Sequence, residues 1–257
     1  MSRSTRVRFR PRPGASVAAF IGVAALVALG TWQLERLEWK QDLIAEMAAR
    51  QRAPAVPLPQ VRSARDAAAL EYRKVRLEGR FLHDREMYLG SRTYRGQVGY
   101  HVVTPMILID GRRVLVDRGW VPPARKAPAT RRDGLVAGVV VVEGLVRRGG
   151  WRGSAMFRPD RQPAPDVWLW PDLPAMIAHA GLGEDAVREI YIEAGPAPVP
   201  GGFPIGGQTR LTLTNNHLQY ALTWYALAVA LIVIYVLHQR RGGTGDAQSD
   251  AREEDAT

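Results

Sequence analysis

Residues 215–241, NNHLQYALTWYALAVALIVIYVLHQRR, decide how the rest of the chain is interpreted. The stretch carries no charged side chain from residue 218 to residue 237. About twenty apolar residues in a helix rise by about 30 Å, which is the thickness of the hydrocarbon core of a bilayer. Arg240 and Arg241 follow, and a cationic flank is typical of the cytoplasmic end of a membrane helix. The stretch therefore predicts a transmembrane helix with His217 at its outer end.

A second apolar segment, residues 15–34, lies near the start of the chain. A short apolar core behind a basic segment is also typical of a cleaved signal peptide. The helical pattern, however, runs on to Leu43 without a turn signal, and no A-x-A site ends the apolar run. We favour a retained transmembrane helix with Trp32 at the outer interface, where indole rings are enriched. Arginines precede this helix and follow the second one, which predicts that both termini are cytoplasmic.

The composition narrows the classes of function. The formal net charge of +10 raises the possibility of nucleic-acid binding. We predict no nucleic-acid partner, because five arginines directly precede the first apolar segment, as expected of a topology signal or of contact with anionic lipid. The chain has no cysteine. This excludes disulfides, thiolate metal sites, iron–sulfur clusters and c-type haem attachment.

Between the two membrane segments the pattern changes to one typical of strands. A proline-rich breaker at residues 53–59 leads into a folded region, where polar and apolar residues alternate from residue 74. Asp110-Gly111 separates two apolar runs and is favoured by a two-residue type I′ hairpin. We expect strands at residues 74–78, 87–92, 100–109, 112–121, 136–146 and 189–193, short helices at 63–70 and 173–180, and a long surface loop at 151–171.

The predicted fold is a membrane protein of the α+β class, in which two transmembrane helices flank a mostly antiparallel, β-rich extracytoplasmic domain with short helices. The valines at residues 139–142 predict a strand buried on both faces. Pro105 and Gly119 indicate an edge or a bulge. The expected divisions are a basic cytoplasmic tail at 1–14, helices at 15–34 and 215–238, an outer domain at 35–214 that begins with an amphipathic extension at 35–50, and a disordered cytoplasmic tail at 239–257.

Few residues of the outer domain indicate chemistry. His83, His101 and His179 have no partner at metal-ligand spacing, so we interpret them as surface or hydrogen-bonded histidines and predict no protein-made metal site. The sequence has no G-x-S-x-G elbow, no P-loop and no G-x-G-x-x-G after a strand, which argues against a hydrolase or nucleotide enzyme. Asp117 would end a strand, and we expect it to pair with Arg118 or to bond the backbone at a bulge. We predict no catalytic residue.

His217 has two possible interpretations. His217, Tyr220 and Trp224 are three, four and seven positions apart, which places them on one helical stripe at the outer boundary of the membrane. This stripe is typical of an interfacial aromatic belt. It is equally suited to a cofactor site in which a neutral imidazole ligates haem iron. On the first helix, a stripe of Trp32, Arg36, Trp39 and Lys40 would offer cations for the haem propionates.

Three blocks of sequence together resemble the Surfeit-locus protein family of cytochrome oxidase assembly factors. They are LGTWQLERLEWKQDLI at residues 29–44, VLVDRGWVP at 114–122 and NNHLQYALTWYALA at 215–228, and their order extends over the whole architecture. The resemblance implies a non-enzymatic protein of the bacterial inner membrane, with a periplasmic central domain, that assists insertion of haem a into subunit I of cytochrome c oxidase.

The resemblance also implies residues and partners. His217 matches the histidine that ligates haem a in some bacterial members, and Trp32, Gln33, Arg36, Trp39 and Lys40 form the family block on the first helix. The expected cofactor is haem a, bound transiently, and the expected partners are subunit I, haem a synthase and membrane lipid. A scaffold for subunit I that never touches haem remains an alternative. A membrane-tethered envelope sensor or hydrolase is a third one.

Overall fold

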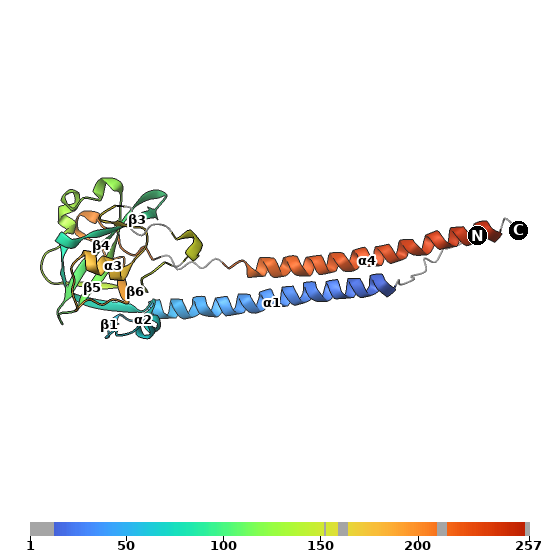
Figure 1. The fold of residues 1–257 in the computed structure, drawn as a ribbon, viewed down its shortest axis with the longest axis horizontal. Coiled ribbons are helices and arrows are strands. Elements are labelled where there is room, and N and C mark those ends of the chain that lie inside the picture. Colours follow the sequence, from blue (N-terminus) through green and yellow to red (C-terminus); the bar gives the residue numbers. More distant parts are fainter. Residues whose placement is uncertain (1–12, 152, 159–163, 210–214, 255–257) are drawn as a thin grey trace. The chain divides into compact units, whose positions relative to one another are not determined.

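The computed structural model describes residues 13–151, 153–158, 164–209 and 215–254. The chain divides into two compact units, a helical unit formed by the two ends of the chain and a β-rich unit formed by residues 46–211. Figure 1 shows both. A long helix at each end and a mixed sheet between them make this an α+β protein.

The helical unit contains α1 (Pro13–Arg52) and α4 (His217–Glu254). Two stretches, Pro13–Arg52 and His217–Arg240, are long and apolar enough to cross a membrane. Most of their apolar side chains are exposed in the isolated chain, as Phe20 and Ile234 illustrate at 75% and 63%. A soluble protein would bury such side chains, because each buried one contributes about 1.5–3 kcal/mol. The amphipathic extension expected at residues 35–50 continues α1 without a break, and α4 runs into the segment expected to be a tail.

The β-rich unit is built on one mixed sheet. Its order is β1-β2-β6-β8-β5-β4-β3-β7, and an additional pairing joins β2 to β4. This pairing closes β2, β6, β8, β5 and β4 into a ring, so the centre of the unit is a small closed barrel. The strands are β1 (Val56–Pro57), β2 (Lys74–Phe81), β3 (Met87–Tyr94), β4 (Gln97–Leu108), β5 (Arg113–Val121), β6 (Val140–Arg148), β7 (Val167–Trp168) and β8 (Ile190–Ala194).

The barrel interior follows from the alternation in the sequence. In β2 the apolar positions Val75 and Leu77 are 0% and 1% exposed, and the residues between them face outward. Side chains from the other ring strands complete the interior, among them Met106, Val116 and Ile192. Because a closed ring leaves no unpaired edge among its own strands, this core is enclosed on all sides.

One sequence expectation about the sheet is wrong. The strand with continuous valines is not buried on both faces, because Val139 and Val141 are 63% and 48% exposed. The sheet is mostly antiparallel, as expected, and the parallel pairings β1–β2, β3–β7 and β5–β8 are short. A run of valines therefore reports strand propensity here rather than two-sided burial.

The hairpin and the bulge of β4 and β5 can be compared with the sequence predictions. The hairpin between β4 and β5 forms as predicted, but only Gly111 has a positive φ there, at +89°, so the turn is not type I′. The predicted bulge is present, with a register shift after Val102 and with Gly119 at φ +119°.

The short helices are α2 (Ala64–Leu70) and α3 (Leu173–His179), and single turns lie at His83–Arg85, Pro123–Arg125, Pro128–Gly134, Ala155–Phe157 and Pro200–Gly202. The expected surface loop at 151–171 includes β7, whose Trp168 is 1% exposed and packs against α3 in a second core. This loop therefore contributes to the core instead of lying wholly on the surface.

Candidate functional site

The two long helices touch each other directly. Gly30 is the buried residue of α1, and a Cβ placed there would lie 2.8 Å from the Tyr225 ring. Two hydroxyl pairs continue the contact, Thr31 Oγ1 with Tyr225 Oη at 3.1 Å and Ser16 Oγ with Tyr235 Oη at 2.6 Å. The pairs place the start of α1 beside the later part of α4, so the helices run antiparallel (Figure 1). A small residue opposite a ring allows this close approach, as at many membrane helix contacts.

His217, the first residue of α4, is half-buried at the end of this contact. Its Nδ1 lies 2.7 Å from Gln33 Oε1 on α1. An amide oxygen only accepts, so with the Gln33 amide in this orientation the proton is on Nδ1. In the neutral imidazole Nε2 is then the acceptor nitrogen, and it has no hydrogen-bond partner among the described residues. A histidine whose other N–H is held by a protein oxygen has the arrangement found at most metal-ligating histidines.

The aromatic and cationic residues of the first helix form a separate exposed stripe. Arg36 Cζ lies 5.8 Å from the centre of the Trp32 ring and 5.2 Å from that of Trp39. Trp32 and Trp39 are 48% and 56% exposed. Gln33, three positions before Arg36, bonds to His217 of α4 instead. The stripe therefore presents a cation framed by two indole rings to whatever surrounds the helix.

The remaining predicted residues differ in exposure. Lys40 is half-buried, as is Trp224, whereas Tyr220 is 55% exposed. In the described part of the chain, no side-chain hydrogen bond or ring contact joins Tyr220, Trp224 or the Trp32 to Trp39 stripe to His217. The contact between His217 and Gln33 was not predicted from the sequence. The spacing of Gln33 three positions after Gly30, which places both on one face of α1, could have indicated it.

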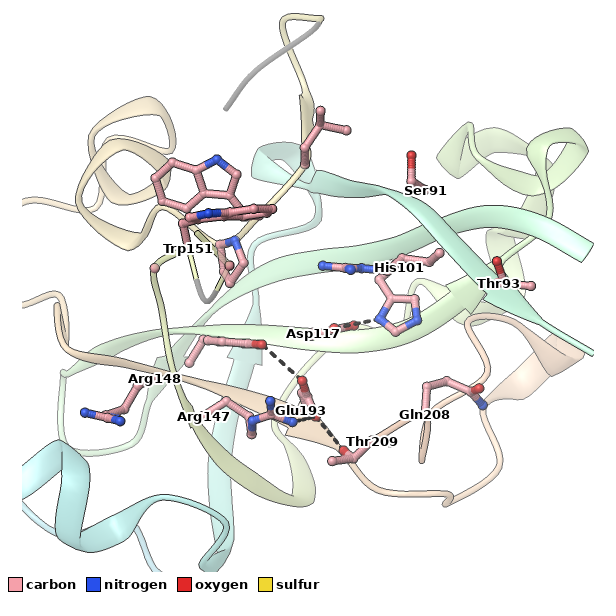
Figure 2. A pocket seen from close by; sticks show the side chains of 17 residues that line it. Ser91, Thr93, His101, Asp117, Arg147, Arg148, Trp151, Glu193, Gln208 and Thr209 are labelled. Atoms are coloured by element: carbon pink, nitrogen blue, oxygen red, sulfur yellow. Dashed lines mark hydrogen bonds and ion pairs between the residues drawn. The ribbon is translucent and has the colours of Figure 1, made fainter. Parts of the chain in front are cut away.

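In the β-rich unit, Asp117 is buried, and both of its carboxylate oxygens accept hydrogen bonds. Its Oδ1 accepts a hydrogen bond from the Gly119 amide at 3.0 Å, which is the predicted bond to the bulge. Its Oδ2 accepts one from His101 Nδ1 at 2.8 Å (Figure 2). The expected pairing with Arg118 is absent, because the Arg118 guanidinium lies against the Phe81 ring and donates to the Gly134 carbonyl oxygen. No local pattern indicates the pairing with His101, which depends on the register of β4 and β5.

Arg118 belongs to a different buried cluster. Its guanidinium lies 4.6 Å from the Phe81 ring centre and donates to the carbonyl oxygen of Gly134, while burial lowers the pKa of Arg118 to about 10. Nearby, Glu86 and Arg131 form an ion pair whose side chains are 2% and 1% exposed. These contacts fix the segments around the barrel.

The arrangement does not form a hydrolase triad. Ser91 lies on the same surface as the His101–Asp117 pair, and its backbone has the unusual φ of +56°. No hydrogen bond joins Ser91 to the imidazole, and Figure 2 shows the serine hydroxyl directed away from the His101 ring. A nucleophile and its base must lie within hydrogen-bond reach, about 2.6–3.2 Å. His101 and Asp117 are therefore a pair without a nucleophile.

Comparison with known proteins gives a consistent result over most of the chain. The profile of the SURF1 family matches residues 20–229, which include most of α1, the barrel and the first part of α4. A SURF1-like protein of Monosiga brevicollis is 37% identical over 226 residues, covering 84% of each chain. Surfeit locus protein 1 of Homo sapiens is 39% identical over 234 residues, covering 84% of this chain and 75% of the human one. A SURF1-like protein of Drosophila melanogaster is 37% identical over 224 residues.

Proposed function

Because the chain belongs to the SURF1 family, we propose that it is a cytochrome c oxidase biogenesis factor that assists insertion of haem a into oxidase subunit I. The observation that carries the proposal is the hydrogen bond between His217 and Gln33. It holds the imidazole in the tautomer that leaves Nε2 as a ligand atom, and neutral imidazole is a common axial ligand of haem iron.

We place α1 and the apolar part of α4 across the bacterial inner membrane, with the β-rich unit in the periplasm. Arginines before residue 13 and after residue 239 support cytoplasmic termini, because positive charge is retained on that side. His217 then lies at the outer interface, since it begins α4 and the arginines follow the apolar run. A periplasmic reporter inserted in the segment at residues 151–171 should be active, and an inactive one contradicts this topology.

The helix contact decides how haem a would be held. Gly30 packs against Tyr225, and Gln33 is bonded to His217. The two helices are therefore already in contact along the segment that contains these four residues. The porphyrin would therefore lie beside the helix pair, not between its helices. When bound, haem a would supply an iron that accepts Nε2 as its ligand. Arg36, framed by Trp32 and Trp39, is a cation available to a propionate group.

An open, one-sided site suits a protein that passes its cofactor on. A ligand moves between two binding states only when its affinity differs between them, and a cofactor enclosed on both faces would be retained. One histidine at an exposed helix surface provides moderate affinity and leaves the other face of the iron for the acceptor. The exposed stripe on α1 provides a surface for subunit I or for lipid.

A scaffold that holds subunit I without contacting haem is the second candidate function. It is favoured by the same hydrogen bond, because joining α1 to α4 is by itself a structural role for His217. The two candidates differ in what His217→Ala does. We expect a strain that carries only this variant to assemble oxidase with a reduced haem a content, while the variant still captures subunit I in pull-downs.

The experiment measures haem a per subunit I in membranes from a deletion strain complemented with wild type or His217→Ala. Full haem a occupancy with His217→Ala supports the scaffold. Normal haem a occupancy in the uncomplemented deletion strain contradicts both candidates and favours an envelope sensor or hydrolase. Ala18→Leu, at an exposed apolar position of α1, is the matched control and should leave occupancy unchanged.

A further inference from the structure

A second candidate site lies in the β-rich unit, where a cavity of about 440 Å³ opens beside the barrel. Its floor is a row of polar side chains that come from four strands, namely His101 of β4, Asp117 of β5, Glu193 of β8 and Arg147 of β6 (Figure 2). Asp117 and Glu193 are direct partners in the parallel register of β5 and β8. The volume lies within the range of about 300–1,000 Å³ typical of small-molecule sites. The polar floor favours a ligand with several hydrogen-bonding groups.

Most charges of the cavity are matched within the protein. Arg147 is paired with Glu193 at 2.9 Å, and Arg148 with Glu71 at 2.8 Å. The remaining carboxylate of the floor, Asp117, accepts a hydrogen bond at each of its oxygens. The described part of the cavity wall therefore offers no spare carboxylate to a positively charged ligand.

Arg92 is the cation of the described wall that has no such partner. It is half-buried, lines the cavity, and has no described carboxylate within ion-pair distance. Its backbone carbonyl accepts a hydrogen bond from the Trp120 indole at 3.2 Å, which holds the strand. Arg92 pairs with Gly99, two residues before His101 on β4, so Arg92 and His101 are diagonal neighbours in the sheet. A guanidinium in this position matches one carboxylate of a ligand.

His101 offers an acceptor beside this cation. His101 Nδ1 donates to Asp117 Oδ2 at 2.8 Å, and the side chains of the pair are only 15% and 4% exposed. In the neutral imidazole Nε2 is then the acceptor nitrogen, and it has no hydrogen-bond partner among the described residues. A ligand that covers this nitrogen must donate an N–H or an O–H to it, because a covered acceptor without a donor costs binding free energy.

The opposite wall is aromatic and apolar. Trp151 and Trp170 line the cavity together with Leu169 and Pro171. The Trp151 indole N–H is bonded to the carbonyl oxygen of Ser154 at 2.9 Å, which holds the ring in place. Indole rings bury a large apolar area, so this wall suits an apolar side chain of the ligand.

We propose that the cavity binds the carboxy-terminal residue of a polypeptide. The α-carboxylate pairs with Arg92, the amide N–H of the same residue donates to His101 Nε2, and its side chain packs against the indole wall. A carboxy-terminal residue carries all three groups on one Cα. An inorganic anion would use Arg92 alone, and a neutral sugar would leave Arg92 without a partner. The site involves neither His217 nor haem.

The test uses the full-length chain in detergent micelles and the peptide N-acetyl-Ala-Ala-Phe, followed by tryptophan fluorescence and by calorimetry. The peptide with a free carboxylate should bind saturably at one equivalent. The same peptide with an amidated carboxy terminus should bind about tenfold more weakly, because the charged contact with Arg92 is lost. A depsipeptide, in which an ester oxygen replaces the last amide N–H, should also bind about tenfold more weakly, because His101 Nε2 is then covered without a donor.

Two variants assign these losses to single side chains. Arg92→Ala should bind the free and the amidated peptide equally. His101→Ala should bind the amide and the ester forms equally. Each comparison is between two ligands on one variant, so a change in stability at the buried pair does not imitate the result. Arg95→Ala, at an exposed position on the same hairpin outside the cavity, is the matched control and should keep both preferences.

Several outcomes would overturn the proposal. They are the absence of saturable binding, equal affinity of wild type for the free and the amidated peptide, and a preference for the carboxylate that persists in Arg92→Ala. Inorganic phosphate or maltotriose that binds as tightly as the peptide would also overturn it, since the cavity would then be an anion site or a sugar site.

A last pair of measurements identifies the source of the ligand and separates the two sites. The unblocked dipeptide Ala-Phe should bind more weakly than the acetylated peptide, because its ammonium group meets no spare carboxylate of the described wall. Tighter binding of the dipeptide would assign the cavity to free peptides and overturn the assignment to a protein terminus. His217→Ala should leave peptide binding unchanged, so a failure of the proposed haem function leaves this result intact, and the reverse also holds.

Discussion

Replacing Gln33 by leucine should weaken haem binding while leaving the ligand His217 in place. The bond between Gln33 Oε1 and His217 Nδ1 measures 2.7 Å and is the side-chain hydrogen bond that the imidazole makes in the described chain. Leucine has a similar volume and no acceptor, so the helix contact is retained while the ring loses its fixed tautomer and orientation. Loss of such a supporting partner costs about 10–100-fold in metal affinity. This range corresponds to about 1.4–2.8 kcal/mol.

The assay is an optical titration of full-length protein in micelles with ferrous and ferric haem, followed by the Soret band. Gln33→Glu keeps an acceptor at the same reach and should bind at least as tightly as wild type, because a carboxylate makes the imidazole more basic. Gln41→Leu makes the same chemical change at an exposed position of α1 and should have no effect. Equal dissociation constants for wild type and Gln33→Leu, or an equal loss with Gln41→Leu, would refute the proposed role of this hydrogen bond.

Three further predictions concern stability and follow from single contacts. Glu86→Gln should destabilise the β-rich unit by about 3–5 kcal/mol, since it leaves the Arg131 charge buried without its partner, as urea unfolding can measure. Burial lowers the pKa of the His83 imidazole below its ordinary 6.5, so as the pH falls the unfolded chain takes up the proton before the folded one does. The free energy of unfolding should therefore fall as the pH drops below about 6.5. His83→Gln should reduce this dependence of the free energy of unfolding on pH between about pH 7.5 and 5. Gly30→Val should lower the melting temperature of the helix pair, because the added Cβ would lie 2.8 Å from the Tyr225 ring, which costs about 1–3 kcal/mol. An unchanged melting temperature would contradict the contact between Gly30 and Tyr225.

Local signals predicted most of the strands and both long helices. The alternation from Lys74 and the Asp110-Gly111 turn located β2, β4 and β5 to within a few residues, because side-chain period and turn chemistry are properties of neighbouring residues. The apolar lengths located α1 and α4 for the same reason. Closure of the barrel was not predictable in this way, since the pairing of β2 with β4 depends on which strands meet in space.

In the candidate site, too, local sequence patterns predicted single residues but not their tertiary contacts. His217 was identified from its position at the start of an apolar helix, but its partner Gln33 is 184 positions away and no local pattern joins the two. His101 and Asp117 are separated by 16 positions, and only the bulged register of β4 and β5 brings them together. Each histidine therefore appeared isolated in the sequence, and in each case the bond to Nδ1 that makes Nε2 available is a tertiary contact.

The central claim is that the chain binds haem a through His217, and the direct measurement is the haem a content of purified protein. Wild type and His217→Ala are purified in mild detergent from cells that make haem a, and the extracted haem is identified by mass and quantified per chain. The account predicts bound haem a in wild type and a clear loss in His217→Ala. Equal haem a in wild type and His217→Ala, or none in wild type, would contradict it.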